Sequence, residues 1–131
     1  MIKKIATKDA PAAVGPYSQA IAVEHLNLIF SAGQIALLPE TGEIVSGGIE
    51  AETHQVFKNL AAVLASADSG LAQVVKATVY LSEMENFQAM NEIYQEYFSE
   101  TQPARSTVAV KQLPKNALVE IEVIALTGKQ D

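Results

Sequence analysis

Apolar residues recur at helical spacing in two segments of the chain, residues 49–67 and 86–98. The first stripe consists of Val56, Leu60, Val63, Leu64 and Ala67, and the second of Phe87, Met90, Ile93, Tyr94 and Tyr97. Gly70 stands just beyond the first stripe, where a left-handed residue often caps a helix. The pattern therefore predicts two amphipathic helices, with Gly70 as the cap of the first.

Shorter apolar segments, several of them rich in β-branched residues, predict six strands. They cover residues 2–6, 19–23, 28–32, 74–81, 105–110 and 118–126. A turn at residues 25–27 would join the second and third strands, the stretch 38–48 reads as a loop, and Pro114 and Asn116 would turn the chain before the last strand. The order β, β, β, α, β, α, β, β predicts one α+β domain over residues 1–131, with both helices packed on one face of a sheet.

The other face of this sheet is expected to be mixed in character. In the last strand Val119, Ile121, Val123 and Ala125 alternate with Leu118, Glu120, Glu122, Ile124 and Leu126. The first set can cover the helices. The second set holds too many apolar residues for a face in water and too many acids for a core. With Arg105 assigned to the same face from the preceding strand, the pattern favours a subunit interface that contains a site.

Composition narrows the class of protein. The chain has 131 residues, of which 49% are apolar and 18% charged, and its formal net charge is −6. No basic cluster is visible, so we expect neither a nucleic-acid nor a membrane-surface partner. The absence of cysteine excludes disulfides and thiolate catalysis and fits a reducing cytoplasm. No segment reaches the roughly 20 apolar residues of a membrane helix, and residues 1–5 lack the apolar run of a signal peptide.

Two charged residues in apolar strands are the first candidates for chemistry. Arg105 could hold a carboxylate through its fork of donors; alternatively it lies on the surface or pairs with Glu120 or Glu122. Glu120 lies inside the most apolar strand, and a partly desolvated carboxyl suits general acid–base work on a water. It could equally pair with Arg105 from a neighbouring strand. Spacing alone does not distinguish Glu120 from Glu122.

Three further residues have both a functional and a structural interpretation. Tyr17 follows the rigid Gly15-Pro16 turn and could wall a pocket or belong to the core. Gly33 could let a ligand approach the backbone or mark a bulge. Asn91, a poor helix former, could cap a loop or reach the site. His25 and His54 have no matching ligand set, so no metal site is expected, and no nucleophile elbow or phosphate-binding glycine loop is present.

Six segments in one order carry a resemblance to a known family. They are Gly15-Pro16-Tyr17-Ser18-Gln19-Ala20, Gly33-Gln34-Ile35, residues 76–81, Met90-Asn91-Glu92-Ile93-Tyr94, Pro103-Ala104-Arg105-Ser106, and Leu113-Pro114-Lys115 followed by Glu120-Ile121-Glu122. Together they resemble the RidA/YjgF family of enamine/imine deaminases over nearly the whole chain.

The resemblance implies a fold, an assembly and an activity. Members have a chorismate-mutase-like α+β fold and form homotrimers with three sites in the clefts between subunits. They hydrolyse 2-aminoacrylate and related 2-imino acids to 2-keto acids and ammonia without a cofactor, as 2-iminobutanoate/2-iminopropanoate deaminases. The resemblance thus predicts an imino acid substrate, a keto acid product and a homotrimer.

By the same resemblance, each candidate residue receives a role. Arg105 matches the arginine that grips the substrate carboxylate, and Glu120 the acid that positions the attacking water. Gly33 and Thr107 match positions whose backbone groups contact the ligand, and Tyr17 and Asn91 match residues lining the cleft. Many members carry Cys in place of Thr107 and Ser in place of Ala32. We expect activity to survive the first difference, and the second to shift substrate preference.

Two other functions stay open at this stage. A module of the same fold could bind 2-keto acids or a protein without turnover. Some relatives are labelled RNA-cleaving translation inhibitors, although the acidic charge and the lack of a basic stripe speak against RNA binding here.

Overall fold

The computed structural model describes residues 1–128, and its elements follow the predicted order. The strands are β1 (Ile2–Ile5), β2 (Ala20–Val23), β3 (Leu28–Ser31), β4 (Val74–Leu81), β5 (Ala104–Ala109) and β6 (Val119–Leu126). The two α-helices of the described residues are α1 (Gly48–Ala65) and α2 (Phe87–Phe98). The β2–β3 turn is a short 3₁₀ segment, Glu24–Leu26, closed by Asn27 in the left-handed region. The α+β class is confirmed.

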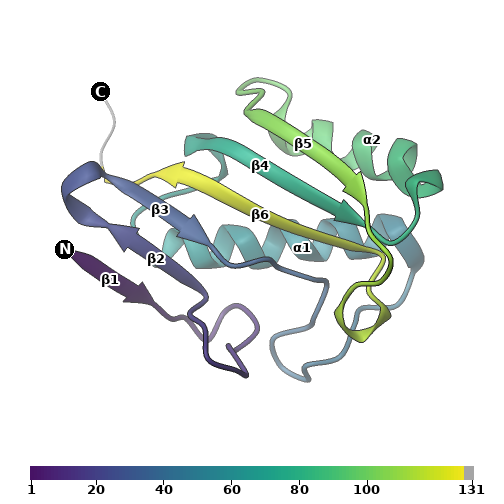
Figure 1. The fold of residues 1–131 in the computed structure, drawn as a ribbon, viewed down its shortest axis with the longest axis horizontal. Helices are drawn as coiled ribbons and strands as arrows, with labels where there is room; N and C mark the ends of the chain where they lie inside the picture. Colours follow the sequence, from purple (N-terminus) through teal and green to yellow (C-terminus); the bar gives the residue numbers. More distant parts are fainter. Residues whose placement is uncertain (129–131) are drawn as a thin grey trace.

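The strands form one sheet in the order β1-β2-β3-β6-β4-β5. Neighbours are antiparallel except β4 and β5, which are parallel and joined through α2. The last strand of the chain thus lies inside the sheet, and β4 separates β5 from β6. Both helices lie behind the sheet in Figure 1, with α1 against β6 and β3 and with α2 packed beside α1.

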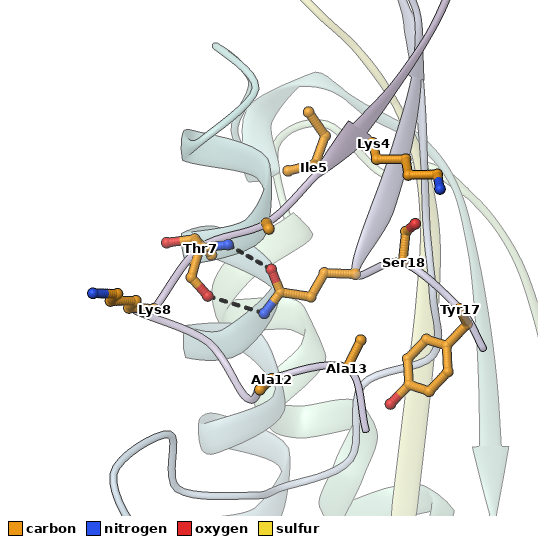
Figure 2. A pocket seen from close by; sticks show the side chains of 10 residues that line it. Lys4, Ile5, Thr7, Lys8, Ala12, Ala13, Tyr17 and Ser18 are labelled. Carbon is orange, nitrogen blue, oxygen red and sulfur yellow. Dashed lines mark hydrogen bonds between the residues drawn. The ribbon is translucent and has the colours of Figure 1, made fainter. Parts of the chain in front are cut away.

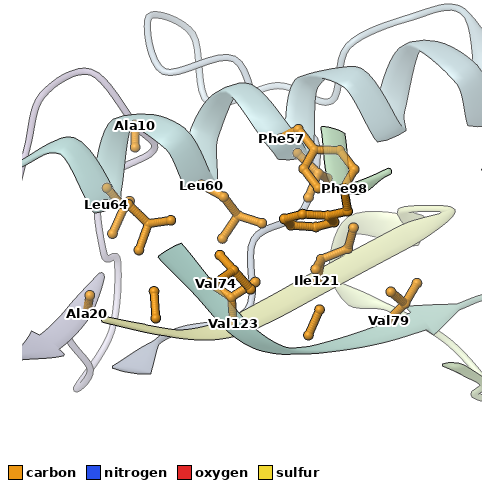
Figure 3. Close-up of a cluster of buried hydrophobic side chains, with 14 of the residues drawn as sticks. Ala10, Ala20, Phe57, Leu60, Leu64, Val74, Val79, Phe98, Ile121 and Val123 are labelled. Atoms are coloured by element: carbon orange, nitrogen blue, oxygen red, sulfur yellow. The ribbon is translucent and has the colours of Figure 1, made fainter. Parts of the chain in front are cut away.

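A single apolar core fills the space between the helices and the sheet (Figure 3). Phe57, Leu60 and Leu64 of α1 point at Ile121 and Val123 of β6. The four residues of β6 expected to cover the helices are all buried, namely Val119, Ile121, Val123 and Ala125. The period-2 pattern therefore assigned the two faces of this strand correctly.

The open face of the sheet is mixed, as expected. Leu118, Glu120, Glu122, Ile124 and Leu126 are all half-buried. Phe30 and Val108 lie on the same face with 42% and 44% of their surface exposed. Neither helix of the described residues is long and apolar enough to cross a membrane.

The expected glycine cap of the first helix is wrong. Helix α1 ends at Ala65, two residues before the predicted end, and Asp68 is the left-handed residue with φ 55°. Gly70 is extended, with φ −165°. Ser69 explains the earlier end, because its N–H donates to Leu64 O at 2.9 Å and its hydroxyl to Leu126 O at 2.6 Å. Asp tolerates the left-handed region well enough to replace glycine there.

Candidate functional site

The predicted site residues lie in two separate places. Arg105 is in register with the buried Ala77 of β4, which faces the helices, whereas Glu120 is in register with Tyr80 on the open face. The expectation that Arg105 and Glu120 share a face of adjacent strands is therefore wrong. Strand β4 lies between them and alternation turns them to opposite sides, so an ion pair between them within one chain is excluded.

Arg105 is held by three side chains of α2, and these four residues form what we call the arginine half-site. Its Nη1 donates to Asn91 Oδ1 at 2.7 Å. The guanidinium carbon lies 4.5 Å from the ring centre of Tyr94 and 5.5 Å from that of Phe87. The Asn91 side chain thus contacts Arg105 rather than capping a loop. Within residues 1–128, Arg105 has these partners and no carboxylate as an ion-pair partner.

The arginine half-site opens onto a polar cavity of about 570 Å³, which Arg105, Asn91 and Tyr94 line. Thr107, two residues along β5, turns to the same side, and its Oγ1 is buried without a hydrogen-bond partner in the described part of the chain. Among the strands of residues 1–128, β5 lies at the edge of the sheet and pairs with β4 alone. Its outer backbone groups are therefore open to a ligand or a second chain.

Glu120 lies in a second cavity of about 440 Å³, which it lines together with Tyr17, Gly33 and Lys115. We call these four residues the glutamate half-site. Residue 34 pairs with Ile121 through both backbone groups, at 2.9 and 3.1 Å, which brings Gly33 against the Glu120 carboxyl. A Cβ at position 33 would lie 2.8 Å from Glu120 Cδ. Gly33 thus allows a group to lie close to the backbone, as expected. That group is the Glu120 carboxyl of the same chain and not a ligand.

The structure distinguishes the two acids of β6 that spacing could not. Glu120 points into the cavity, whereas Glu122 accepts a short hydrogen bond from the Tyr80 hydroxyl. Burial, and then the neighbouring charge of Glu122, raise the pKa of Glu120 above its ordinary value. The hydrogen bond to Glu122 likewise raises the pKa of Tyr80. Glu120 is therefore the acid suited to exchange protons with a bound water.

Tyr17 is placed by the loop that joins β1 to β2. The Gln19 amide fastens this loop: Nε2 donates to Thr7 O at 3.0 Å and to Pro11 O at 2.7 Å, and Oε1 accepts from Thr7 N–H at 2.6 Å. Figure 2 shows the two bonds to Thr7 as dashed lines. Tyr17 is 54% exposed. It is a wall residue and not a core tyrosine.

Tyr17 also lines a third, mostly apolar cavity of about 480 Å³ on the side of β1. The two lysines that line this cavity, Lys4 and Lys8, extend in opposite directions and do not converge (Figure 2). The cavity therefore lacks the convergent cations that would hold an anion, and it is not a candidate for the site.

Two buried polar residues of α1 support the glutamate half-site, and sequence reasoning missed both. Glu52 accepts from Leu118 N–H at 2.9 Å, two residues before Glu120, and burial raises the pKa of Glu52. Asn59 Nδ2 donates to Leu37 O at 2.9 Å and to Ile35 O at 3.2 Å. The sequence did hold a signal for Glu52: it lies one helical turn before Val56, so it falls on the apolar stripe, where a charged residue is expected to be buried and to need a partner.

Lys115 is a further residue without a predicted role. Its Nζ donates to Gly42 O at 3.0 Å and joins two loops at the rim of the second cavity. Lys115 and Asn116 both adopt left-handed dihedral angles, with φ 55° and 56°. The turn expected at Pro114 and Asn116 is confirmed, and it carries a cation to the cavity that holds Glu120.

Comparisons with known proteins identify relatives that match almost the full chain. The family described as Endoribonuclease L-PSP matches residues 7–127. A RutC family protein of Pyrococcus abyssi is 53% identical, over 92% of this chain and 94% of its own. The human 2-iminobutanoate/2-iminopropanoate deaminase is 43% identical, over 95% and 89%.

A solved structure agrees with these sequences. The Yersinia pestis protein YyfA, described as a member of the conserved Rid protein family, is 47% identical over 97% of this chain and 100% of its own, with a TM-score of 0.92. The arrangement of strands and helices described above is therefore that of the Rid proteins. The chain belongs to the RidA/YjgF family, as its six sequence segments indicated.

Proposed function

We propose that the chain hydrolyses 2-imino acids to 2-keto acids and ammonia, in a site that two copies of the chain complete. The observation that carries the proposal is the pair of half-sites. One presents a guanidinium without a counter-ion in residues 1–128, and the other a half-buried carboxyl with a raised pKa. Relatives 43–47% identical that bear deaminase names support the same reaction class.

The assembly is a homotrimer with three clefts between subunits. The two half-sites lie on opposite faces of one chain, so a substrate can touch both only if the arginine half-site of one subunit meets the glutamate half-site of its neighbour. The exposed Phe30 and Val108 on the open face support burial against another copy, as does the outer edge of β5, which pairs with no other strand of the described residues.

The reaction requires an oriented substrate and a group that transfers protons. Two donors of Arg105 hold the substrate carboxylate in a bidentate pair. The Glu120 carboxylate takes a proton from water as the water oxygen bonds to the iminium carbon, giving a carbinolamine. That proton passes to the amine nitrogen, the C–N bond breaks to release ammonia, and loss of the hydroxyl proton leaves the keto acid. Overall, an iminium acid and water give a keto acid and an ammonium ion.

The substrate class is 2-aminoacrylate, reacting as its imine tautomer, and related 2-imino acids. An iminium carbon is already electrophilic, so a positioned water and a proton acceptor suffice and the reaction needs no cofactor. Thr107 contributes a backbone contact from the edge strand, and Tyr17 and Gly33 bound the cleft on the side of Glu120.

The test couples the protein to a dehydratase that makes 2-aminoacrylate from serine, and follows pyruvate release above the uncatalysed rate. We expect acceleration by the wild type and its loss in Arg105→Ala and in Glu120→Gln. Lys58→Ala removes an exposed cation of α1 and should leave the rate unchanged. Equal rates for wild type and Arg105→Ala would refute the role of Arg105.

The same material separates the two alternative functions. Calorimetric binding of 2-ketobutyrate without turnover of any imino acid would favour a sensing module. The family description names an endoribonuclease, so RNA cleavage is assayed in parallel. RNA cleavage by the wild type that persists in Glu120→Gln, together with no imine hydrolysis, would overturn the deaminase proposal.

A further inference from the structure

The aromatic rings beside Arg105 have no assigned role in the reaction. We propose that Tyr94 and Phe87 are positioning residues: they form an aromatic clamp that fixes the Arg105 guanidinium for the substrate carboxylate. The inference rests on the proposed function, because it assumes that Arg105 binds this carboxylate.

The clamp holds the guanidinium without consuming its hydrogen-bond donors. The guanidinium carbon lies 4.5 Å from the Tyr94 ring centre and 5.5 Å from that of Phe87, within the range of a cation–π contact. A guanidinium has five N–H donors, and Asn91 accepts from one nitrogen at 2.7 Å. A carboxylate partner would occupy the paired N–H donors of the guanidinium and neutralise its charge. Aromatic faces leave the donors and the charge available to the ligand.

The three contacts come from one face of α2. Phe87, Asn91 and Tyr94 follow one another at intervals of four and three residues, the spacing that places side chains above one another on a helix. The helix therefore presents a ring, an amide and a second ring to one point on β5. Shifting any of the three by one residue would turn it away from Arg105.

Tyr94 acts through its ring and not through its hydroxyl. The hydroxyl is buried and has no hydrogen-bond partner within residues 1–128, and the side chain is 6% exposed. The ring itself is fixed by Phe98 and Phe57, with ring centres 4.8 and 5.9 Å away. A phenylalanine at this position would keep the ring and remove an unpaired polar atom, so Tyr94→Phe should behave as wild type.

The test measures carboxylate binding and catalysis in matched variants of the full chain. We expect Tyr94→Leu and Phe87→Leu to weaken 2-ketobutyrate binding by calorimetry about 3- to 30-fold, and to raise KM for the imino acid more than they lower kcat. Tyr94→Phe should retain wild-type values. Binding of the neutral amide of 2-ketobutyrate should not change in any variant.

Tyr97→Leu is the matched control. Tyr97 lies on the same helix and its ring stacks on Phe57, with ring centres 4.2 Å apart, whereas the cation–π contacts of Arg105 within residues 1–128 are with Tyr94 and Phe87. Loss of Tyr97 removes a comparable aromatic contact from α2, together with the hydrogen bond between the Tyr97 hydroxyl and His54 Nδ1 at 2.8 Å, but none of the direct contacts of Arg105. Equal weakening in Tyr97→Leu and Tyr94→Leu, or wild-type binding in Tyr94→Leu, would overturn the proposal. Should Tyr94→Leu fail to fold, Phe87→Leu at its half-buried position decides.

A second measurement separates failure of the clamp from failure of the proposed function. Arg105 is the one arginine of the chain, so its Nε–H signal is unambiguous in an NMR spectrum. Without any ligand, that group should be more mobile in Tyr94→Leu and Phe87→Leu than in wild type, Tyr94→Phe or Tyr97→Leu. Unchanged mobility refutes the clamp. Restricted mobility in a wild type that neither binds keto acid nor hydrolyses imines refutes only the proposed function.

Discussion

Residue 33 shows how closely the candidate acid is fitted to its surroundings. The Glu120 carboxyl occupies the space that any side chain at this position would fill. No positive φ is required of Gly33, so the backbone itself would accept another residue. The constraint is the carboxyl of Glu120, which is the far end of a flexible side chain and can move.

Gly33→Ala should therefore damage catalysis more than folding. The added methyl group displaces the Glu120 carboxyl, and a misplacement near 1 Å can lower a rate by about 100-fold. We expect kcat to fall on that order while the melting temperature stays close to wild type. Ala36→Gly, which changes a buried neighbour in the opposite sense, should instead reduce stability and spare kcat. A Gly33→Ala protein with full activity would show that Glu120 has no fixed position to keep.

The charge of Glu122 predicts a shift in the pH dependence of the reaction. Glu120 must be ionised to accept a proton, so activity falls as the pH drops through its pKa, which burial and Glu122 raise. Tyr80 lies beside the pair, and Glu40, Lys115 and Tyr17 line the same cavity. Removing one negative charge should lower the pKa of Glu120, because less repulsion opposes its ionisation.

The measurement is the pH profile of kcat/KM for Glu122→Gln. Its acidic limb should move to lower pH than in wild type, while Gln keeps an oxygen that can accept from Tyr80. Glu92→Gln removes an exposed charge of α2 and should leave the limb in place. A limb that stays, or moves to higher pH, in Glu122→Gln would contradict the assigned role of Glu120.

Among the elements, the loop between β1 and β2 depends most on a single side chain. Gln19 satisfies backbone groups of Thr7 and Pro11 from inside the protein, where water cannot replace it. This loop carries Tyr17 to the wall of the glutamate half-site. The Gln19 side chain therefore fixes both the conformation of this loop and the position of Tyr17 in the cavity.

Gln19→Ala should loosen this loop and weaken the fold moderately. Buried donors and acceptors left without partners cost about 1–3 kcal/mol, so we expect a loss of that order in the free energy of unfolding. Hydrogen exchange should speed up in residues 7–17 and not in α1. Gln112→Ala, which breaks an exposed bond to Asn116, should change neither. Unaltered exchange in residues 7–17 would show that the loop is held by other contacts.

The elements themselves could be predicted from the sequence, because hydrophobic periodicity is local. The order in which the strands pair in the sheet could not be predicted. β6, the last strand, enters the sheet between β3 and β4, and no local signal requires it. The face of Arg105 was therefore assigned wrongly: in β5 both alternating rows mix polar and apolar residues, so the pattern favours neither side. The glycine cap failed for a similar reason, because a distant contact of Ser69 with Leu126 O helps fix where α1 ends.

At the scale of the whole molecule, the separation of the half-sites is the central finding. A sheet has two faces, and its alternation places Arg105 on one and Glu120 on the other, so no rotamer change within a chain can unite them. A cyclic oligomer, as proposed above, would resolve this geometry, because each subunit would offer one half-site to each of two neighbours. The family members' residues could be matched along the sequence, but which of them come from the same subunit requires the fold.

Mixed oligomers provide the test at this scale. Arg105→Ala and Glu120→Gln should each be inactive alone, because every cleft then lacks one half. After co-refolding of equal amounts, a cleft works when its arginine comes from a Glu120→Gln subunit and its glutamate from an Arg105→Ala subunit. Random mixing gives this pairing at about one cleft in four, so about a quarter of the wild-type rate should return. A site built within one chain cannot be rescued in this way, since every subunit retains its own defect. Continued inactivity in mixed oligomers of proven composition would therefore refute the shared cleft, while leaving the individual roles of Arg105 and Glu120 to their single variants.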